Sequence, residues 1–364
     1  MARVHEKDEK WMRVALGLAR RGLGNVAPNP AVGCILVKDE IVVGRGWTQP
    51  GGRPHAETKA IEQAGEDAVG AAAYVTLEPC AHVGQTPPCS EALVNAGISR
   101  AVIAVTDPDP RVSGRGIECL KASGISVTMG VLEKEATELN LGFFTRVTKG
   151  RPSFAIKTAS TLDGKIALSN GDSKWITSER ARDFGHLLRA ECDGILVGAN
   201  TVVADDPSLT CRLPGLEAHS PIPIILDSNM RVPRTTQLLK GEAANAATII
   251  ITKFGNNIDN HSGRKFEAIE VESPHNLTEV AETLGARGFN SVLIEGGAQV
   301  AASFLTANLV DNIYVFSAGK IIGNNGLGSI GNLNLASLPN APHFTPTGIR
   351  KLGPDMLATY RKAE

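Results

Sequence analysis

Residues 55–57 read His-Ala-Glu, and residues 79–89 read Pro-Cys-Ala-His-Val-Gly-Gln-Thr-Pro-Pro-Cys. His55, Cys80 and Cys89 offer one imidazole and two thiolates, a mixed donor set that favours zinc. Three protein ligands leave the fourth tetrahedral position open for water, which is typical of a catalytic zinc and not of a structural one. Glu57 stands two residues from His55, where its carboxylate can transfer protons without binding the metal. The two segments therefore predict a zinc site that activates water.

The spacing of the two cysteines is unusual. Hydrolytic deaminases of cytosine and adenine combine an H-x-E segment with a P-C segment and a second cysteine, and two residues normally separate their cysteines. Here eight residues separate Cys80 from Cys89. The longer loop predicts a different substrate pocket, suited to a bulkier nucleotide.

The residues around the ligands predict where they lie in the fold. His55 opens an Ala- and Glu-rich stretch at 56–63 that is typical of a helix. Residues 73–77 have the pattern of a short buried strand that ends just before Cys80. Ser90 is expected to cap a helix that begins next to Cys89. Two ligands would then lie at helix N-termini, whose positive dipole ends favour thiolate over thiol.

The alternative is that these residues bind no metal, because an H-x-E triplet alone is a weak signal and chains of this size contain scattered cysteines. The remaining cysteines lie in apolar or ordinary surroundings and are interpreted as inert thiols; they are Cys34, Cys119, Cys192 and Cys211. The joint occurrence of ligands, carboxylate and flanking elements favours the metal site.

Composition limits the classes of protein. The 364 residues are enough for two domains. A formal net charge of −1 weighs against nucleic acid as the main partner, though one or two arginines could still hold a small phosphorylated substrate. The cysteine usage favours a reducing cytoplasm. The charged N-terminal residues do not resemble a signal peptide, and no apolar run is long enough to cross a membrane.

The first half alternates strand and helix patterns. Apolar residues at helical spacing from Trp11 to Ala19 predict a first helix. Residues 32–37 and 41–44 flank Lys38-Asp39-Glu40 and predict a hairpin. Strands are expected near 73–77, 101–105 and 125–129, and helices before Gly97 and over 116–123. This order predicts an α/β layer with one antiparallel hairpin.

Residues 139–150 are interpreted as a join, because polar and basic residues there separate two regions with apolar patterns. A boundary near Lys149 gives domains at 1–148 and 149–364. The second half predicts another α/β domain, with a helix over 178–191 that Ser178 caps. Its expected strands are 154–159, 195–197, 222–226, 248–251, 292–294 and 313–316.

Three features of the second half could bind ligands. Gly296-Gly297 lies between a strand and a helix, where freed backbone amides can bind a cofactor pyrophosphate, although such glycine pairs are also common turns. Asp205-Asp206-Pro207 could bind ribose hydroxyls or form a solvated turn. Trp175 could stack on a flat ring, although a core or loop-anchoring role is the commoner one. The G-x-G-x-x-G fingerprint of dinucleotide-binding folds is absent at the Gly296 segment.

Taken together, these motifs resemble the bifunctional deaminase–reductase family of riboflavin biosynthesis, over nearly the whole chain. The deaminase marks are Pro28-Asn29-Pro30, His55-Ala56-Glu57, Glu78-Pro79-Cys80-Ala81-His82, Thr86-Pro87-Pro88-Cys89 and Asp107-Pro108-Asp109-Pro110. The reductase marks are Thr161-Leu162-Asp163-Gly164-Lys165, Trp175-Ile176-Thr177, Asp205-Asp206-Pro207 and Glu295-Gly296-Gly297. The eight-residue spacer is normal in this family.

The resemblance implies a three-layer cytidine-deaminase-like domain followed by a dihydrofolate-reductase-like domain. The first would use zinc and Glu57 to deaminate 2,5-diamino-6-(ribosylamino)-4(3H)-pyrimidinone 5′-phosphate. The second would use NADPH to reduce the ribosyl group to a ribityl chain. We expect a cytoplasmic homo-oligomer that acts on this small phosphorylated pyrimidine, without nucleic acid or membrane.

The resemblance also implies binding residues. For NADPH they are Ala159, Trp175, Thr201, Asp205, Ser228, Gly297, Ala298, Gln299, Val300, Ala301, Ala302 and Ser303. For the reductase substrate they are Ser173, Arg189, Leu209, Arg212, Glu295 and Lys157, with the two arginines as phosphate partners; Asn29 and His82 would hold the base in the deaminase. The family usually has proline where Gly319 stands, which puts the cofactor-side loop in question.

Two alternative hypotheses for the function are also compatible with the sequence. The second domain could be catalytically inactive and serve assembly alone, which an assay of NADPH oxidation would reveal. Alternatively, the chain could be an RNA-binding deaminase-like module, which the near-neutral charge disfavours.

Overall fold

The structure is a computed structural model that describes residues 2–81, 87–110, 112–240, 248–256 and 266–363, with side chains from Glu6 onward. The chain forms two compact units, residues 1–150 and 151–364. Within the described ranges, none of the helices combines the length and the apolar character that a membrane span requires.

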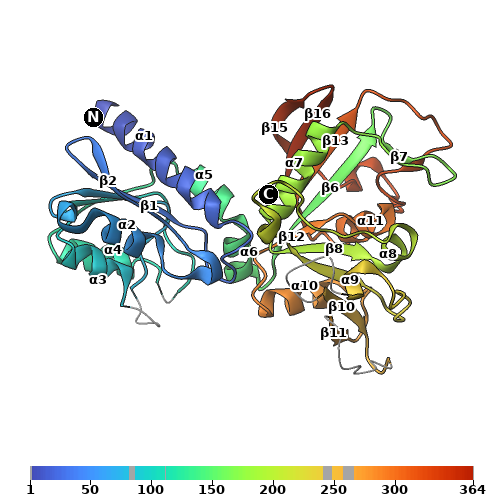
Figure 1. Ribbon diagram of the computed structural model, residues 1–364, viewed down its shortest axis with the longest axis horizontal. Helices are drawn as coiled ribbons and strands as arrows, with labels where there is room; N and C mark the ends of the chain where they lie inside the picture. The colour runs from blue at the N-terminus through green and yellow to red at the C-terminus, as the bar shows by residue number, and fades with distance from the viewer. Residues whose placement is uncertain (1, 82–86, 111, 241–247, 257–265, 364) are drawn as a thin grey trace. The chain divides into compact units, whose positions relative to one another are not determined.

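The first unit is built on a five-stranded sheet with the order β2-β1-β3-β4-β5 (Figure 1). The expected hairpin is present, with Lys38 paired to Ile41. The pair β1–β3 is antiparallel, whereas β3–β4 and β4–β5 are parallel. The strands are β1 (Gly33–Lys38), β2 (Ile41–Trp47), β3 (Ala72–Val75), β4 (Arg100–Ile103) and β5 (Ser126–Met129).

Helices cover both faces of this sheet. Figure 1 shows α1 and α5 on one face and α2, α3 and α4 on the other. This three-layer arrangement confirms the fold class expected for the first half. The helices are α1 (Ala2–Ala19), α2 (Ala56–Ala64), α3 (Cys89–Asn95), α4 (Arg115–Ala122), α5 (Glu133–Leu139) and α6 (Leu141–Lys149).

Two glycines of β2 let α2 approach the sheet closely. A Cβ atom on Gly44 would lie 2.1 Å from the carbonyl oxygen of Ala60, and one on Gly46 would lie 1.9 Å from that of Ala56. No side chain fits at such separations, so both positions require glycine. Because His55 and Glu57 stand at the start of α2, these glycines also fix how deep the two side chains sit against the sheet.

The expected join between the domains is wrong for most of its length. Residues 141–149 form α6, whose Phe143 is buried in the core of the first unit. The basic residues that suggested a linker lie on the partly exposed side of this helix. Phe144 and Val147 also pack against this core, so the segment is an amphipathic helix, and its interspersed Thr, Arg and Lys residues concealed the pattern.

The second unit contains a nine-stranded sheet with the order β11-β10-β9-β8-β12-β6-β13-β16-β15. Neighbours from β11 to β13 run parallel, and β16 and β15 add an antiparallel hairpin at one edge. The strands are β6 (Ser153–Thr161), β8 (Gly194–Gly198), β9 (Ile222–Leu226), β10 (Thr248–Lys253), β11 (Phe266–Val271), β12 (Ser291–Ile294), β13 (Val310–Ala318), β15 (Phe344–Leu352) and β16 (Asp355–Lys362), with β7 (Lys165–Ala167) and β14 (Leu327–Gly328) in a separate pair. The sequence patterns missed β11, β15 and β16, whose residues are mostly not buried.

Alternate residues of the parallel strands enter different cores. Leu196 and Ile294 pack with helices on one side, whereas Ile195 and Val197 belong to a separate core. Ser178 precedes the expected helix, but its side chain makes no capping bond; its backbone N–H donates to Asp355 at 2.6 Å instead. The helices are α7 (Glu179–Ala190), α8 (Ala199–Asp205), α9 (Gln237–Lys240), α10 (Leu277–Ala286) and α11 (Ala298–Thr306).

A buried ion pair fixes the first strand of this unit. Both Nη atoms of Arg151 donate to the Asp311 carboxylate, at 2.7 and 2.9 Å, and the N–H of Phe154 donates to the same carboxylate at 2.9 Å. Each charged side chain is only 10% exposed. The pair joins the starts of β6 and β13, which are neighbours in the sheet.

We predict that Asp311→Ala lowers the free energy of unfolding of the second unit by about 3–5 kcal/mol, because it leaves the Arg151 charge buried without its partner. Urea denaturation followed by circular dichroism measures the change. Asp183→Ala, at an exposed position of α7, is the matched control. A loss below about 1 kcal/mol would show that Arg151 finds other partners.

Candidate functional site

Three different elements bring the predicted metal ligands together. His55 is the residue that precedes α2, Cys80 follows the end of β3, and Cys89 is the first residue of α3. The expectation that two ligands lie at helix N-termini is confirmed by these positions. Ser90, however, is not a cap: it lies inside the first turn of α3, and its hydroxyl donates to the Cys80 carbonyl at 3.1 Å.

The separations of the ligand atoms fit a zinc ion. The Nδ1 atom of His55 lies 3.3 Å from the sulfur of Cys89 and 3.6 Å from that of Cys80. Nitrogen and sulfur ligands at normal zinc distances lie about 3.4–3.8 Å apart in a tetrahedron. The three ligand atoms also lie within 4.8 Å of one another, as a single cluster.

The charges around these atoms suit a proton-transferring carboxylate. Glu57 is only 3% exposed. Burial raises the pKa of Glu57 to about 7, and the negative charge of Cys80 adds to this effect. Hydrogen bonds from Cys89 and His55 hold the pKa of Cys80 at about 4. A carboxyl group that titrates near neutral pH can both accept and return a proton.

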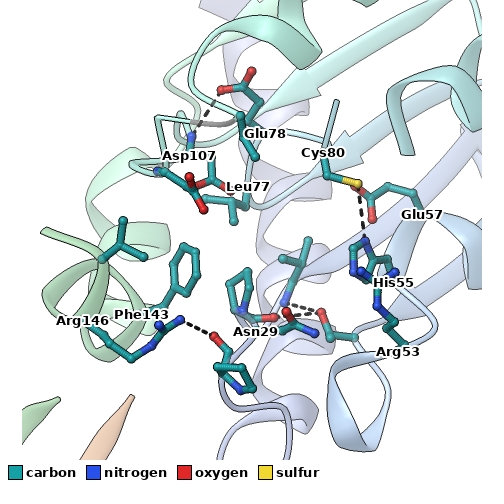
Figure 2. A pocket seen from close by; sticks show the side chains of 17 residues that line it. Asn29, Arg53, His55, Glu57, Leu77, Glu78, Cys80, Asp107, Phe143 and Arg146 are labelled. Atoms are coloured by element: carbon teal, nitrogen blue, oxygen red, sulfur yellow. Dashed lines mark hydrogen bonds between the residues drawn. The ribbon is translucent and has the colours of Figure 1, made fainter. Parts of the chain in front are cut away.

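A cavity of about 230 Å³, the first cavity, opens beside the cluster (Figure 2). His55, Glu57 and Cys80 line it, and so does Asn29, whose side-chain amide donates to the Gly52 carbonyl at 2.9 Å. This placement agrees with the expectation for Asn29. His82 lies outside the described residues.

The first cavity also contains residues that the sequence did not assign to the site. They include Arg53, Asp107, Asp109, Phe143 and Arg146. Burial raises the pKa of Asp107 to about 6. The repeated Asp-Pro pair at 107–110 was a usable signal, because two acids in a stiff loop after a strand often face a site. Phe143 and Arg146 gave no such signal, since they lie on a helix more than 50 residues from the last ligand.

A second cavity, of about 750 Å³, lies in the second unit. Its wall includes the first turn of α11 and the residues that follow β8 and β9. Gly297 is the N-cap of α11 and has no side chain to satisfy the first amides of the helix. These amides suit an anionic group such as a dinucleotide pyrophosphate, so the cavity fits NADPH. The predicted cofactor residues that line it are Thr201, Ser228, Gly297, Ala298, Gln299, Val300 and Ser303.

The other predicted cofactor residues lie elsewhere. Among the described residues that line the second cavity, Ala159, Trp175 and Asp205 do not occur, and Ala301 and Ala302 are buried. Trp175 is 61% exposed, so a core role is wrong. Asp206 accepts a bond from the Gln237 N–H at 2.9 Å, which supports the structural-turn reading of the Asp-Asp-Pro segment at that position.

The predicted substrate residues of the second unit include a tight charged cluster. Glu295 accepts from Nε and Nη2 of Arg189, at 2.8 and 2.9 Å, and lies 3.6 Å from the Lys157 ammonium. Burial would raise the pKa of Glu295, but Arg189 and Lys157 outweigh it and hold that pKa well below its ordinary value. The bidentate face of Arg189 that we expected to hold phosphate is therefore paired with Glu295.

The remaining predicted substrate residues are spread around this cluster. Arg212 is exposed and donates to the Ser208 hydroxyl at 2.8 Å, and Ser173 is exposed. Leu209 is buried in a core, so its side chain is not available to a ligand. The sequence did not single out His186, whose pKa burial and the neighbouring arginines lower to about 4.

The loop that contains the unusual Gly319 is anchored by Asp163. The Thr161 hydroxyl donates to its carboxylate at 2.6 Å, and the N–H of Gly323 donates at 2.7 Å. These bonds lower the pKa of Asp163 to about 2. The same loop continues to Leu327 and Gly328, which line the second cavity.

We predict that Cys80→Ser abolishes stoichiometric zinc binding, because a serine hydroxyl does not supply the thiolate that the site requires. Metal analysis after dialysis measures bound zinc per chain. Cys119→Ser is the control and should retain the wild-type zinc content. Full zinc retention in Cys80→Ser would remove this residue from the ligand set.

We predict that Arg189→Met lowers the free energy of unfolding by about 3–5 kcal/mol at pH 7, because Glu295 loses its main partner. In the wild type the low pKa of Glu295 contributes stability above the ordinary glutamate pKa, and this is lost as the pH falls through the folded-state value. In the variant, burial raises the pKa of Glu295, so this carboxyl becomes protonated as the pH falls. The difference in unfolding free energy between the variant and the wild type must therefore be smaller at pH 4.5 than at pH 7. Denaturant melts at pH 7 and pH 4.5, with Arg182→Met as control, measure this. An equal deficit at both pH values would contradict it.

Comparison with known proteins gives two family matches. Residues 5–105 match the model described as "Cytidine and deoxycytidylate deaminase zinc-binding region". Residues 152–358 match the model described as "RibD C-terminal domain".

Full-length relatives are also found. The chain is 42% identical over 359 residues to the riboflavin biosynthesis protein RibD of Aquifex aeolicus, with 99% of each chain covered. It is 40% identical to the Escherichia coli protein of the same name, over 96% of this chain and 98% of that one. A structure of Acinetobacter baumannii RibD has a TM-score of 0.88 at 35% identity, covering 99% of this chain and 100% of that one. A Thermotoga maritima diaminohydroxyphosphoribosylaminopyrimidine deaminase/5-amino-6-(5-phosphoribosylamino)uracil reductase gives 0.85 at 37% identity, with 99% of each covered.

Proposed function

The chain belongs to the RibD family of bifunctional riboflavin biosynthesis enzymes, with a zinc-binding deaminase domain and an NADPH-dependent reductase domain, and from this premise we propose its substrate and the residues that act in each step. We assign the deaminase to the first unit, residues 1–150, and the reductase to the second, residues 151–364, two residues beyond the boundary expected from the sequence. The substrate of the first is 2,5-diamino-6-(ribosylamino)-4(3H)-pyrimidinone 5′-phosphate. The observation that carries the proposal is the cluster of His55, Cys80 and Cys89, of which His55 and Cys80 line the first cavity together with Glu57.

In the deaminase, His55, Cys80 and Cys89 hold the metal and Glu57 moves the protons. When bound, zinc supplies the Lewis acidity that makes water a nucleophile at neutral pH. Glu57 accepts one proton as oxygen adds to the ring carbon that bears the amino group. It returns that proton to the nitrogen as the carbon–nitrogen bond breaks, so ammonia leaves and Glu57 ends ionised. Asn29 holds the base in the cavity.

In the reductase, the N-terminus of α11 binds the cofactor, together with Thr201 and Ser228. When bound, NADPH supplies the hydride for C1′ of the ribose. The bond from C1′ to the ring oxygen breaks, and this oxygen needs one proton to become the new hydroxyl. We assign that proton to Lys157, whose Nζ lies 3.6 Å from the Glu295 carboxylate. We assign the substrate phosphate to Arg212, because Arg189 is paired with Glu295.

We also propose that the chain is a cytoplasmic homo-oligomer. None of the six cysteines is in a disulfide, which suits a reducing compartment. The edge strand β15 has only its last residue buried, and Ile349 on it is 71% exposed. Proteins normally protect exposed edge strands from uncontrolled pairing, and we assign a second copy of the chain as the partner that covers β15. Sedimentation velocity tests this by measuring the oligomeric state in solution.

We predict that Glu57→Gln retains zinc but releases ammonia at least about 100-fold more slowly, because the amide cannot accept the proton. Ammonia release and zinc content measure the first step. The same preparation, supplied with the deaminated intermediate, must oxidise NADPH at the wild-type rate. Near-normal ammonia release would refute the role of Glu57, and no NADPH oxidation by the wild type would show that the second domain is inactive.

A further inference from the structure

Glu78 is a buried carboxylate without an assigned role. It follows β3, lies two residues before the ligand Cys80, and is 3% exposed. Both of its oxygens accept hydrogen bonds from backbone N–H groups that lie beyond β4. The donors to Oε2 are Asp107 at 3.3 Å and Gly114 at 3.0 Å, and the donors to Oε1 are Gly116 at 3.0 Å and Ile117 at 3.3 Å.

Two of these bonds replace a missing helix cap. Gly114 is the N-cap of α4, and it has no side chain that could accept from the first turn. The N–H groups of Gly116 and Ile117 stand at the second and third helical positions, which an N-cap side chain normally satisfies. The carboxylate of Glu78 takes over this function from a distant part of the chain, and its charge suits the positive end of the helix.

The backbone around Glu78 also touches α4 directly. A Cβ atom on Gly116 would lie 2.0 Å from the carbonyl oxygen of Pro79. Only glycine allows this approach. The segment that carries Cys80 and the start of α4 are therefore held together by backbone contact as well as by the four hydrogen bonds.

The same interactions set one wall of the first cavity. The N–H of Asp109 donates to the Asp107 carboxylate at 2.8 Å, and both aspartates line the cavity. In Figure 2, Asp107 and Cys80 lie on opposite sides of Leu77, and Glu78 is hydrogen-bonded to the Asp107 backbone. Glu78 thus links the loop that carries the two aspartates to the segment that carries a metal ligand.

We propose that Glu78 is a positioning residue of the deaminase: it fixes the wall formed by Asp107 and Asp109 relative to Cys80, and so determines how tightly the pyrimidine nucleotide is bound. The proposal rests on the proposed deaminase substrate lying in the first cavity. Glu78 is one of the residues that line the first cavity, but both of its carboxylate oxygens accept from backbone N–H groups, so we assign it a positioning role and no direct part in the reaction.

The decisive variant is Glu78→Gln, which keeps the size of the side chain. Its amide group would replace one acceptor oxygen with a donor that faces two backbone N–H groups, so half of the bonds are lost and the donors are left unsatisfied. We expect the KM for the diaminopyrimidine nucleotide to rise about tenfold or more, with kcat within about threefold of the wild type. Zinc content and NADPH oxidation by the reductase domain should be unchanged.

The matched control is Glu91→Gln. Glu91 also lies two residues from a ligand cysteine, but it is exposed on α3 and does not line the first cavity. Its KM and kcat should both equal those of the wild type. Hydrogen exchange adds a readout that does not depend on activity: amides 114–117 should exchange faster in Glu78→Gln, and those of β1 should not.

Gly114→Ala is a milder second variant, should Glu78→Gln fail to fold. Gly114 has a φ of +81°, which alanine disfavours, while its Cβ would meet no atom within 4 Å. It should raise KM in the same direction. An unchanged KM in the variants that fold, or a loss of zinc or kcat at constant KM, would overturn the proposal. If the wild type itself does not deaminate this nucleotide, the proposed function fails instead.

Discussion

Burying a carboxylate is costly, and two buried glutamates and a third whose side chain is 10% exposed offset this cost in three different ways that organise both sites. Glu57 sits where burial and a nearby thiolate raise its pKa to about 7. Glu78 accepts four backbone hydrogen bonds. Glu295 is paired with Arg189 and Lys157. The same side chain is therefore the proposed proton carrier, a structural anchor or the centre of a charged cluster, and its surroundings decide which.

The folds place these groups by a shared rule. In the first unit Glu78 and the Asp107 loop follow neighbouring parallel strands, β3 and β4. In the second unit Glu295 follows β12, which lies between β8 and β6 in the sheet. Parallel strands bring their carboxyl ends to one edge, so residues distant in sequence converge there. The glycines of β2 add the close approach of α2, without which His55 and Glu57 would sit too far from β3.

The sequence predicted some parts of these sites well and others poorly, for physical reasons. The sequence singled out His55, Cys80 and Cys89, which the structure brings together, and Glu57, which lines the same cavity, because metal chemistry requires particular residue types at short spacings. It singled out the start of α11, which lines the second cavity, because glycine before a helix frees amides for an anion. The expectation that Arg189 holds phosphate did not anticipate its pairing with Glu295, since 106 residues separate the two. The role expected for α6 as a join failed because Phe143, Phe144 and Val147 pack against the core of the first unit, although polar residues lie between them.

The sequence by itself determined the metal-donor set, the candidate proton carrier and the order of the two domains. Each of these follows from particular residue types at short spacings in the chain. Only the tertiary structure decided which residues surround and support these groups. They are the cavity wall of Asp107, Phe143 and Arg146, the partner of Arg189, and the capping of α4 by Glu78. The reason is that these contacts join segments far apart in the chain. Which donor meets which acceptor then depends on strand order and on how closely backbones approach, and neither is encoded in any short stretch of sequence.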